Sequence, residues 1–241
     1  MQLELQTLGS VGLRSRDGGA SIAQIVQPKR LALLVYLALA PRRRCRRRDQ
    51  IVSLFWPELD TDHARGALSQ ALRYLRRSIG ETVVITQGEE DVGIDGAMIW
   101  CDAAAFKQHC DSHEFERALG LYKGRFMEGS FVSDASPEYD QWVEDERNHL
   151  RQLALDATLR LGEVALASGD VGAALDWARR AWAIAPGDEP VSARLIELLD
   201  QSGDRAGALR TYEVFRQRLK TEFEVAPSHE TQALIARILA R

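Results

Sequence analysis

The spacing of apolar residues changes along the first hundred residues from alternation to a helical period and back. Residues 1–25 alternate apolar and polar positions around Gly9, Gly12 and the turn Asp17–Gly19, which predicts short antiparallel strands. Three segments with helical spacing follow, each ended by proline or glycine, and predict helices in PKRLALLVYLALAP (28–41), RDQIVSLFWP (48–57) and DTDHARGALSQALRYLRRSIG (60–80). TVVITQGEEDVGID (82–95) alternates again around a glycine turn. The predicted order is therefore strands, three helices and a hairpin.

The third predicted helix, residues 61–79, separates apolar from polar side chains. Asp60, Thr61 or Asp62 is expected to cap its start, and Gly80 is expected to end it. The stripe that should face a core consists of Leu68, Ala71, Leu72, Leu75 and Ile79. The opposite side carries Gly66, Gln70, Arg73 and Arg77, with Tyr74 at one edge and Ser69, Arg76 and Arg65 at the other. Arginine, glutamine and serine pair with base edges and phosphates, but many surface helices also expose them to solvent.

From residue 102 onward the spacing is helical throughout, and a short motif repeats. Ser168, Gly169, Asp170, Ala174 and Leu175 recur 34 positions later as Ser202, Gly203, Asp204, Ala208 and Leu209. This period is the length of the tetratricopeptide repeat, a helix-turn-helix unit in which glycine ends one helix and aspartate caps the next. Ala118 and Leu119 have the same placement, which indicates a degenerate earlier unit.

The same region predicts further helices and a core. Residues 137–168 predict one long helix, and the last residues a closing helix capped by Ser228. The expected buried contacts of the repeats are Leu175, Trp177, Leu195, Leu198, Leu209, Tyr212 and Phe215. The fold class predicted is an α+β winged helix-turn-helix domain, residues 1–97, followed by an all-α tetratricopeptide-like domain, residues 98–241.

Charge is distributed unevenly along the chain, although the net charge is −4. Residues 1–100 carry 14 Lys and Arg against 11 Asp and Glu, whereas residues 101–241 carry 17 against 24. Six arginines, residues 42–44 and 46–48, surround Cys45; we call them the arginine cluster. Arg46, Arg47 and Arg48 are expected at the start of the second helix, where the helix dipole disfavours cations unless an anion is near. A DNA phosphate would supply that anion, so Arg44 and these three arginines are predicted backbone contacts, with Cys45 as a packing residue.

Little in the sequence suggests catalysis, a cofactor or a membrane. The phosphate loops GxxxxGK[ST] and GxGxxG and the motifs HExxH and GxSxG are not found. Cys101, His109, Cys110 and His113 are zinc-type ligands within thirteen residues, but their spacing matches no known zinc motif, and buried thiols beside exposed histidines are the simpler interpretation. The three cysteines form no CxxC pair, and no signal peptide or membrane span is evident. We therefore expect a cytoplasmic protein with reduced thiols that is not an enzyme and has no cofactor or metal.

Several stretches together resemble the SARP-type bacterial transcriptional activators. They are KRLALLVYLALAP, RDQIVSLFWPE, ARGALSQALRYLRRSIG, IWCDAAAF, ALGLYKGRF and LKTEFEVAPSHETQALIARI, spread over essentially the whole chain. The resemblance implies an OmpR-like winged helix followed by a bacterial transcriptional activator domain. It also implies binding to direct repeats in promoter DNA, often as a side-by-side pair, and contact with RNA polymerase. In the family this hairpin usually carries basic residues that reach the minor groove, whereas here its tip, Gln87 to Asp91, contains three acids, which would repel phosphate.

Two functions are therefore weighed. The favoured one is a sequence-specific DNA-binding activator that contacts double-stranded DNA through Arg44, Arg46, Arg47, Arg48, Arg65, Ser69, Gln70, Arg73, Tyr74, Arg76 and Arg77. The alternative is a protein-interaction or oligomerisation module whose winged helix does not bind DNA. Basic residues favour the first function, and the acidic hairpin tip favours the second.

Overall fold

The computed structural model describes residues 3–15, 27–40 and 45–240. The chain forms two compact units, Met1–Leu150 and Arg151–Arg241. The division falls inside one long helix. The domain boundary expected between residues 97 and 98 stays a prediction, and the turn Asp17–Gly19 lies outside the described residues.

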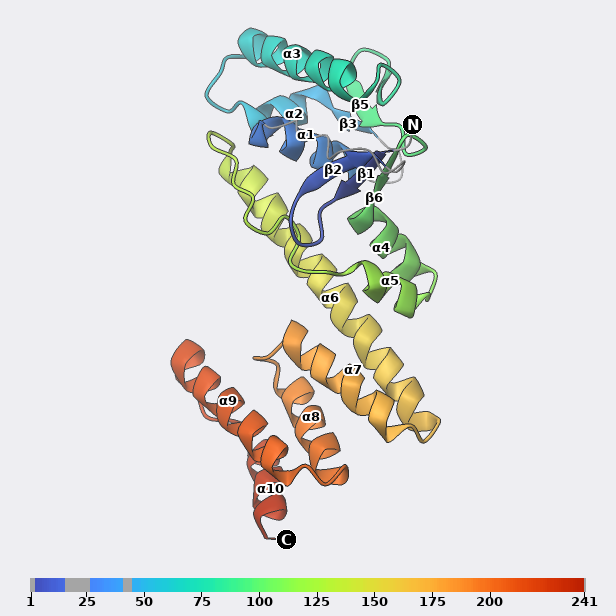
Figure 1. Cartoon of the computed structure of the whole chain (residues 1–241). Coiled ribbons are helices and arrows are strands. Elements are labelled where there is room, and N and C mark those ends of the chain that lie inside the picture. Colours follow the sequence, from blue (N-terminus) through green and yellow to red (C-terminus); the bar gives the residue numbers. More distant parts are fainter. Residues whose placement is uncertain (1–2, 16–26, 41–44, 241) are drawn as a thin grey trace. The chain divides into compact units, whose positions relative to one another are not determined.

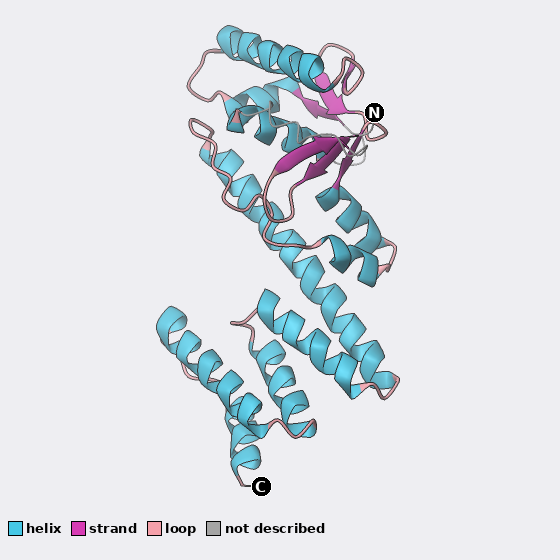
Figure 2. Ribbon diagram, viewed as in Figure 1, coloured by secondary structure: helices cyan, strands magenta, loops and turns pink. Residues whose placement is uncertain are grey.

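The first unit follows the predicted order of strands, three helices and a hairpin (Figures 1 and 2). Its elements are β1 (Leu3–Gln6), β2 (Gly12–Ser15), α1 (Pro28–Ala38), β3 (Cys45–Arg47), α2 (Arg48–Phe55), α3 (Thr61–Ile79), β4 (Val84–Gln87), β5 (Asp91–Ile94), β6 (Ile99–Cys101), α4 (Asp102–Asp111), α5 (Phe115–Leu121) and the start of α6 (Pro137–Ala167). The sequence did not predict β3 and β6, which are three residues each.

These strands form two small sheets. One has the order β2-β1-β6, in which β1 pairs antiparallel with β2 and parallel with β6. The other has the order β3-β5-β4, in which both pairings are antiparallel. In Figure 1, α1 and α2 lie between α3 and the β2-β1-β6 sheet, so α3 is on the outer side of this layer.

A buried carboxylate connects β1 to the start of α4. Asp102 is 6% exposed, and it accepts hydrogen bonds from the backbone N–H groups of Thr7 at 2.8 and 2.9 Å and of Leu8 at 2.9 Å. The Thr7 hydroxyl donates a further bond of 2.6 Å, and the Ala103 N–H one of 2.7 Å. Because buried polar groups are costly without partners, this cluster fixes where β1 meets α4.

The chain after β1 also pairs with a segment far away in the sequence. Gly9 N–H donates to the Arg125 carbonyl at 3.1 Å, and Met127 N–H donates to the Thr7 carbonyl at 2.8 Å. Gly9 has φ of 101°, and a Cβ on Gly124 would lie 3.1 Å from its Cα. Glycine at both positions therefore allows the two backbones to approach.

Aromatic rings join the helices of the first unit. Tyr36 on α1 contacts Phe55 on α2 and Trp142 on α6, with ring centroids 5.8 and 4.8 Å apart. Tyr139 lies 4.9 Å from Phe55 and is 2% exposed. Trp142 is thus a packing residue, since edge-on ring contacts at these distances stabilise a core.

The second unit contains the rest of α6 followed by α7 (Val171–Ile184), α8 (Glu189–Gln201), α9 (Arg205–Phe223) and α10 (His229–Leu239). The turns before α7 and α9 have the same geometry. Gly169 and Gly203 have φ of 79° and 86°, and the hydroxyls of Ser168 and Ser202 each donate to the carbonyl three residues earlier, at 2.8 and 2.9 Å. The repeated sequence therefore marks two copies of one helix end.

The repeated aspartates act as predicted. Asp170 and Asp204 each cap a helix by accepting, at 2.8 Å, a hydrogen bond from the backbone N–H three residues later. Ala174 and Ala208, in the first turn after each cap, are buried at 1% and 0%. The expected core is confirmed: Leu175, Leu195, Leu198 and Phe215 are buried, and Trp177, Leu209 and Tyr212 are partly buried against it.

The last helix is capped by residues from two segments. The Ser228 hydroxyl accepts a bond from Thr231 N–H at 3.2 Å, as predicted. Glu189 of α8 accepts from Ser228 N–H at 2.7 Å, which is the role a capping-box acid would have. Burial of Glu189 opposes its ionisation, but hydrogen bonds from Thr231 and Ser228 outweigh this and lower its pKa.

Candidate nucleic-acid interface

Helix α3 begins and ends at the expected residues. The Asp60 side chain accepts hydrogen bonds from the N–H groups of Asp62 and His63 at 3.1 and 3.0 Å, and Gly80 ends the helix with φ of 118°. The pKa of Asp60 is lowered, mainly by the hydrogen bonds from the backbone and side chain of His63, which outweigh the opposing effect of desolvation. All residues of the predicted apolar stripe are buried, and Ala64 is buried beside them.

The opposite side of α3 is open to solvent. Its exposed residues are Arg65, Gly66, Ser69, Gln70, Arg73 and Arg77, which we call the α3 face. Within the described part of the chain, the side chains of Arg73 and Arg77 have neither a hydrogen bond nor an ion pair, so their guanidinium groups are available to a ligand. Ser69 is already engaged in part, because its hydroxyl donates to the Arg65 carbonyl at 2.9 Å.

Gly66 lies in the middle of this face without an internal reason to be glycine. A Cβ built there meets no atom within 4 Å. Glycine inside a helix costs about 0.5 to 1 kcal/mol relative to alanine, so an unneeded glycine weakens α3. Close approach of an external backbone is one use for a missing side chain at such a position.

Two predicted contact residues at the edge of α3 are engaged within the protein. Arg76 is half-buried and its Nη2 lies 3.4 Å from the Val84 carbonyl, which joins α3 to β4. The Arg30 guanidinium lies 3.7 Å from the ring centroid of Tyr74. The sequence did not predict a role for Arg30, whose only signal is the basic pair after Pro28 at the start of α1.

The three described arginines of the arginine cluster do not all lie at the start of α2, because Arg46 lies in β3. The Arg46 guanidinium is 4.1 Å from the Tyr36 ring centroid, and its Nη2 lies 3.4 Å from the Leu39 carbonyl. Its Nε is buried without a hydrogen-bond partner in the described residues. The expectation that all three arginines begin α2 overlooked this strand, which exists only through pairing with β5.

Arg47 and Arg48 do lie at the start of α2, as predicted. Arg47 is the N-cap residue, has a side chain 61% exposed, and pairs with Asp49 at 3.2 Å. Arg48 is half-buried. Arg44 falls outside the described residues, and its predicted contact stays a prediction.

Cys45 precedes these arginines in β3 and carries a free thiol. Burial, with a smaller contribution from the carboxylate of Asp91, raises its pKa. A raised pKa disfavours the reactive thiolate, in accord with the expected packing role.

The tip of the β4-β5 hairpin lies next to α2 and α3. Glu90 Oε2 is 3.7 Å from Arg65 Nη2, and the Glu90 carbonyl accepts a 2.8 Å hydrogen bond from Arg48 N–H. An acid of the tip therefore neutralises part of the charge on the α3 face. The electrostatic consequence is modest, since both side chains are about half exposed.

Other candidate chemistry gains little from the structure. Within residues 3–15, 27–40 and 45–240, no group of three or more His, Cys, Asp or Glu side chains could hold a metal ion. His109 pairs with Glu114 at 2.5 Å, while burial raises the pKa of Cys101 to about 11. Over the same ranges, no helix is both long and apolar enough to span a membrane.

Comparisons with known proteins identify the family. A solved structure of Mycobacterium tuberculosis EmbR in complex with a low affinity phosphopeptide matches with a TM-score of 0.63 and 20% identity, which shows a shared fold. The match covers 99% of this chain, which in turn spans 65% of that EmbR chain. No curated protein matches. The model of the bacterial transcriptional activator domain matches residues 102–239. The chain therefore belongs to the family of bacterial transcriptional activators that carry this domain, the SARP-type regulators.

Proposed function

We propose that this protein is a sequence-specific DNA-binding transcriptional activator in which residues 1–97 act as a winged helix-turn-helix and α3 is the recognition helix. The observation that carries the proposal is the α3 face. It presents the unpaired side chains of Arg73 and Arg77 with glutamine and serine, without an acid on the helix after Asp62. Such a face suits the major groove, where arginine and glutamine read base edges. Membership in a family of transcriptional activators supports it.

The exposed residues divide into two proposed roles. Gln70 and Arg73, near the middle of the face, contact bases. Arg47, Arg65 and Arg77 contact phosphates, with Arg44 and Arg48 as further phosphate contacts and Ser69 beside them. Tyr74, Arg76 and Arg46 act by positioning α3 and β3, given their contacts inside the protein.

The wider role follows from the family. We propose that the protein acts in the bacterial cytoplasm, binds direct repeats at promoters as a pair of chains, and contacts RNA polymerase.

A salt series tests the proposal. Affinity of the full chain for mixed promoter fragments should fall with a log-log slope near −5, as expected for about six phosphate contacts. A slope near zero would exclude DNA binding of this kind.

The alternative, a protein-interaction module, is favoured by the Arg65–Glu90 pair, because the hairpin tip places an acid on the proposed DNA face.

Releasing Arg65 from Glu90 should strengthen DNA binding. We expect Glu90→Gln to raise affinity about 3- to 10-fold at low salt and to steepen the salt slope by about one phosphate contact. Glu89→Gln is the matched control, since it removes the same charge from the same tip and Glu89 has no ion pair with Arg65. Equal effects of the two variants would show that only net charge matters.

Gly66→Ala should have opposite effects on stability and on binding. The free energy of unfolding should rise by about 0.5 to 1 kcal/mol, because alanine favours the helix and the added methyl meets open space. DNA affinity should fall, because the methyl would stand between α3 and the DNA backbone or base edges. Urea unfolding and fluorescence anisotropy measure the two quantities.

Gly120→Ala is the control for this pair of measurements. Gly120 is an exposed helical glycine of α5, and a Cβ there also meets nothing within 4 Å. It should gain stability without losing DNA affinity. Unchanged DNA binding by Gly66→Ala would move the docking surface away from the centre of the α3 face.

A further inference from the structure

A groove lies on the first unit between the segment 127–132 and the first turns of α6. Its cavity measures about 470 Å³ and is lined by apolar and charged side chains, among them Met127, Phe131, Val132, Val143, Asp140, Glu144 and Arg147. No residue of the α3 face lines this groove. The groove is therefore a separate surface.

Phe131 is the most exposed large apolar side chain described, at 75%. The neighbouring Val132 is 6% exposed, so the backbone turns one side chain inward and leaves the ring in solvent. An aromatic ring exposed beside a groove is typical of a contact surface, since aromatic residues are enriched where proteins meet.

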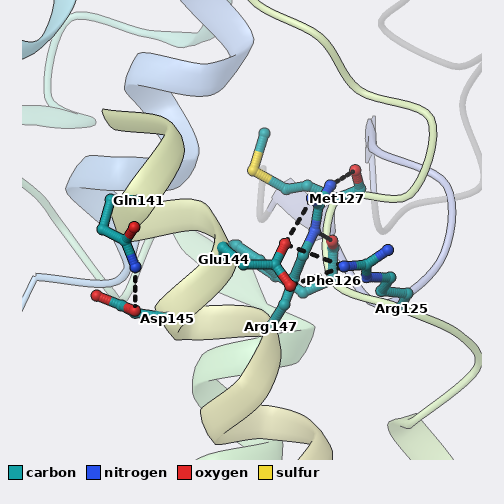
Figure 3. A network of polar contacts seen from close by, with 7 residues as sticks. All are labelled: Arg125, Phe126, Met127, Gln141, Glu144, Asp145 and Arg147. Atoms are coloured by element: carbon teal, nitrogen blue, oxygen red, sulfur yellow. Dashed lines mark hydrogen bonds and ion pairs between the residues drawn. The ribbon is translucent and has the colours of Figure 1, made fainter. Parts of the chain in front are cut away.

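The segment that carries Phe131 is held at both ends. Arg147 of α6 donates to the carbonyls of Phe126 and Met127 at 2.8 and 2.9 Å, and Glu144 pairs with Arg125 at 2.8 Å (Figure 3). At the other end, Ser136 N–H donates to the Leu54 carbonyl at 2.9 Å. The backbone on either side of Phe131 is therefore held in place before a partner binds, which lowers the entropic cost of binding.

Charge around the groove is mainly negative, because Arg147, a basic side chain of its lining, pairs with Glu144. Residues 126–146 contain no Lys, Arg or His and seven acids, which are Glu128, Asp134, Glu138, Asp140, Glu144, Asp145 and Glu146. Glu144 is neutralised by Arg125 and Arg147, and Asp145 accepts from Gln141 at 2.7 Å (Figure 3). Asp140, which lines the groove, is exposed and has no side-chain partner in the described residues. The rim would repel phosphate and attract cations.

We propose that this groove is a docking site for a basic amphipathic segment of a protein partner. Apolar residues of that segment pack against Phe131 and the apolar lining, while its Lys or Arg side chains pair with Asp140 and the acids around it. Charge complementarity favours this occupant over nucleic acid or an acidic peptide. The proposal goes beyond DNA binding and does not depend on it.

The test uses two labelled 18-residue helical peptides of the same pattern, one of Lys and Leu and one of Glu and Leu, titrated into the DNA-free full chain. The Lys-Leu peptide should bind, and NMR shift changes should concentrate at residues 127–132 and 137–147. Phe131→Ser should weaken binding about tenfold, as for an aromatic contact at the centre of an interface. The Glu-Leu peptide should bind at least tenfold more weakly.

Phe223→Ser is the matched control, because Phe223 is 60% exposed and lies in the second unit. It should leave peptide affinity unchanged. Phe131→Ser preserves charge, so equal binding by this variant and the parent would mean general attraction of cations and would overturn the proposal. Shift changes at the groove on raising the protein concentration alone would identify a second copy of the chain as the occupant, and would also overturn it.

Discussion

Replacing Asp102 with alanine should lower the free energy of unfolding of the first unit by about 3 to 5 kcal/mol. The carboxylate is 6% exposed and accepts from the N–H groups of Thr7 and Leu8 and from the Thr7 hydroxyl. Alanine would leave these donors buried without a partner, at about 1 to 3 kcal/mol each. Amide hydrogen exchange at Thr7 and Leu8 measures the loss where it occurs, since a chain with two units need not unfold in one step.

Two variants show whether the effect belongs to the cluster. Asp111→Ala removes an exposed acid at the other end of α4 and should change stability by less than about 0.5 kcal/mol. Thr7→Val keeps the shape but deletes one hydroxyl, and should cost about 1 kcal/mol. A loss below about 1 kcal/mol for Asp102→Ala would mean that water or a backbone shift replaces the carboxylate.

Arg73→Ala should weaken binding to specific DNA by about 1 to 3 kcal/mol, roughly 5- to 150-fold, and relax the preference for sequence. Arg73 is exposed at the centre of the α3 face, and its side chain has no hydrogen bond or ion pair within the described part of the chain. Selection from a random DNA pool, followed by affinity measurements on the best and on scrambled sites, separates the two effects.

Two arginines provide the comparison. Arg47→Ala should weaken binding to all sequences alike and reduce the salt slope by about one contact, as a phosphate contact would. Arg117→Ala removes an arginine of α5 whose side chain is 72% exposed, and should change neither quantity. If Arg73→Ala keeps both affinity and preference, α3 does not present this face to DNA.

The helices were predictable because their signals are local. The apolar stripe of α3, its cap Asp60 and the repeated caps Asp170 and Asp204 are set by residues within one or two turns, and the structure has all of them. Strands β3 and β6 were missed because each is three residues long and exists only by pairing with distant segments, β5 and β1. Strand preference depends on such neighbours more than on the residues themselves.

The candidate site was predicted in part for the same reason. Helical geometry places Gln70 and Arg73 on the outside of α3, and they are exposed. It cannot show that Arg46 stacks on Tyr36 or that Arg30 lies over Tyr74, because these contacts join different elements. The count of arginines in the cluster therefore overstated how many are free to bind an anion.

The parallel pairing of β6 with β1 has a consequence for how such proteins can be divided. A fragment that stopped at residue 97 would lose β6 and Asp102, leaving β1 as an open edge next to two amides without an acceptor. Open edges of this kind favour aggregation. Since residues 125–128 also pair with the chain after β1, an autonomous fragment needs the chain to at least residue 128, which lies inside the matched family domain. We therefore expect the N-terminal residues 1–97 and the matched domain, residues 102–239, to be inherited together and not to recombine separately.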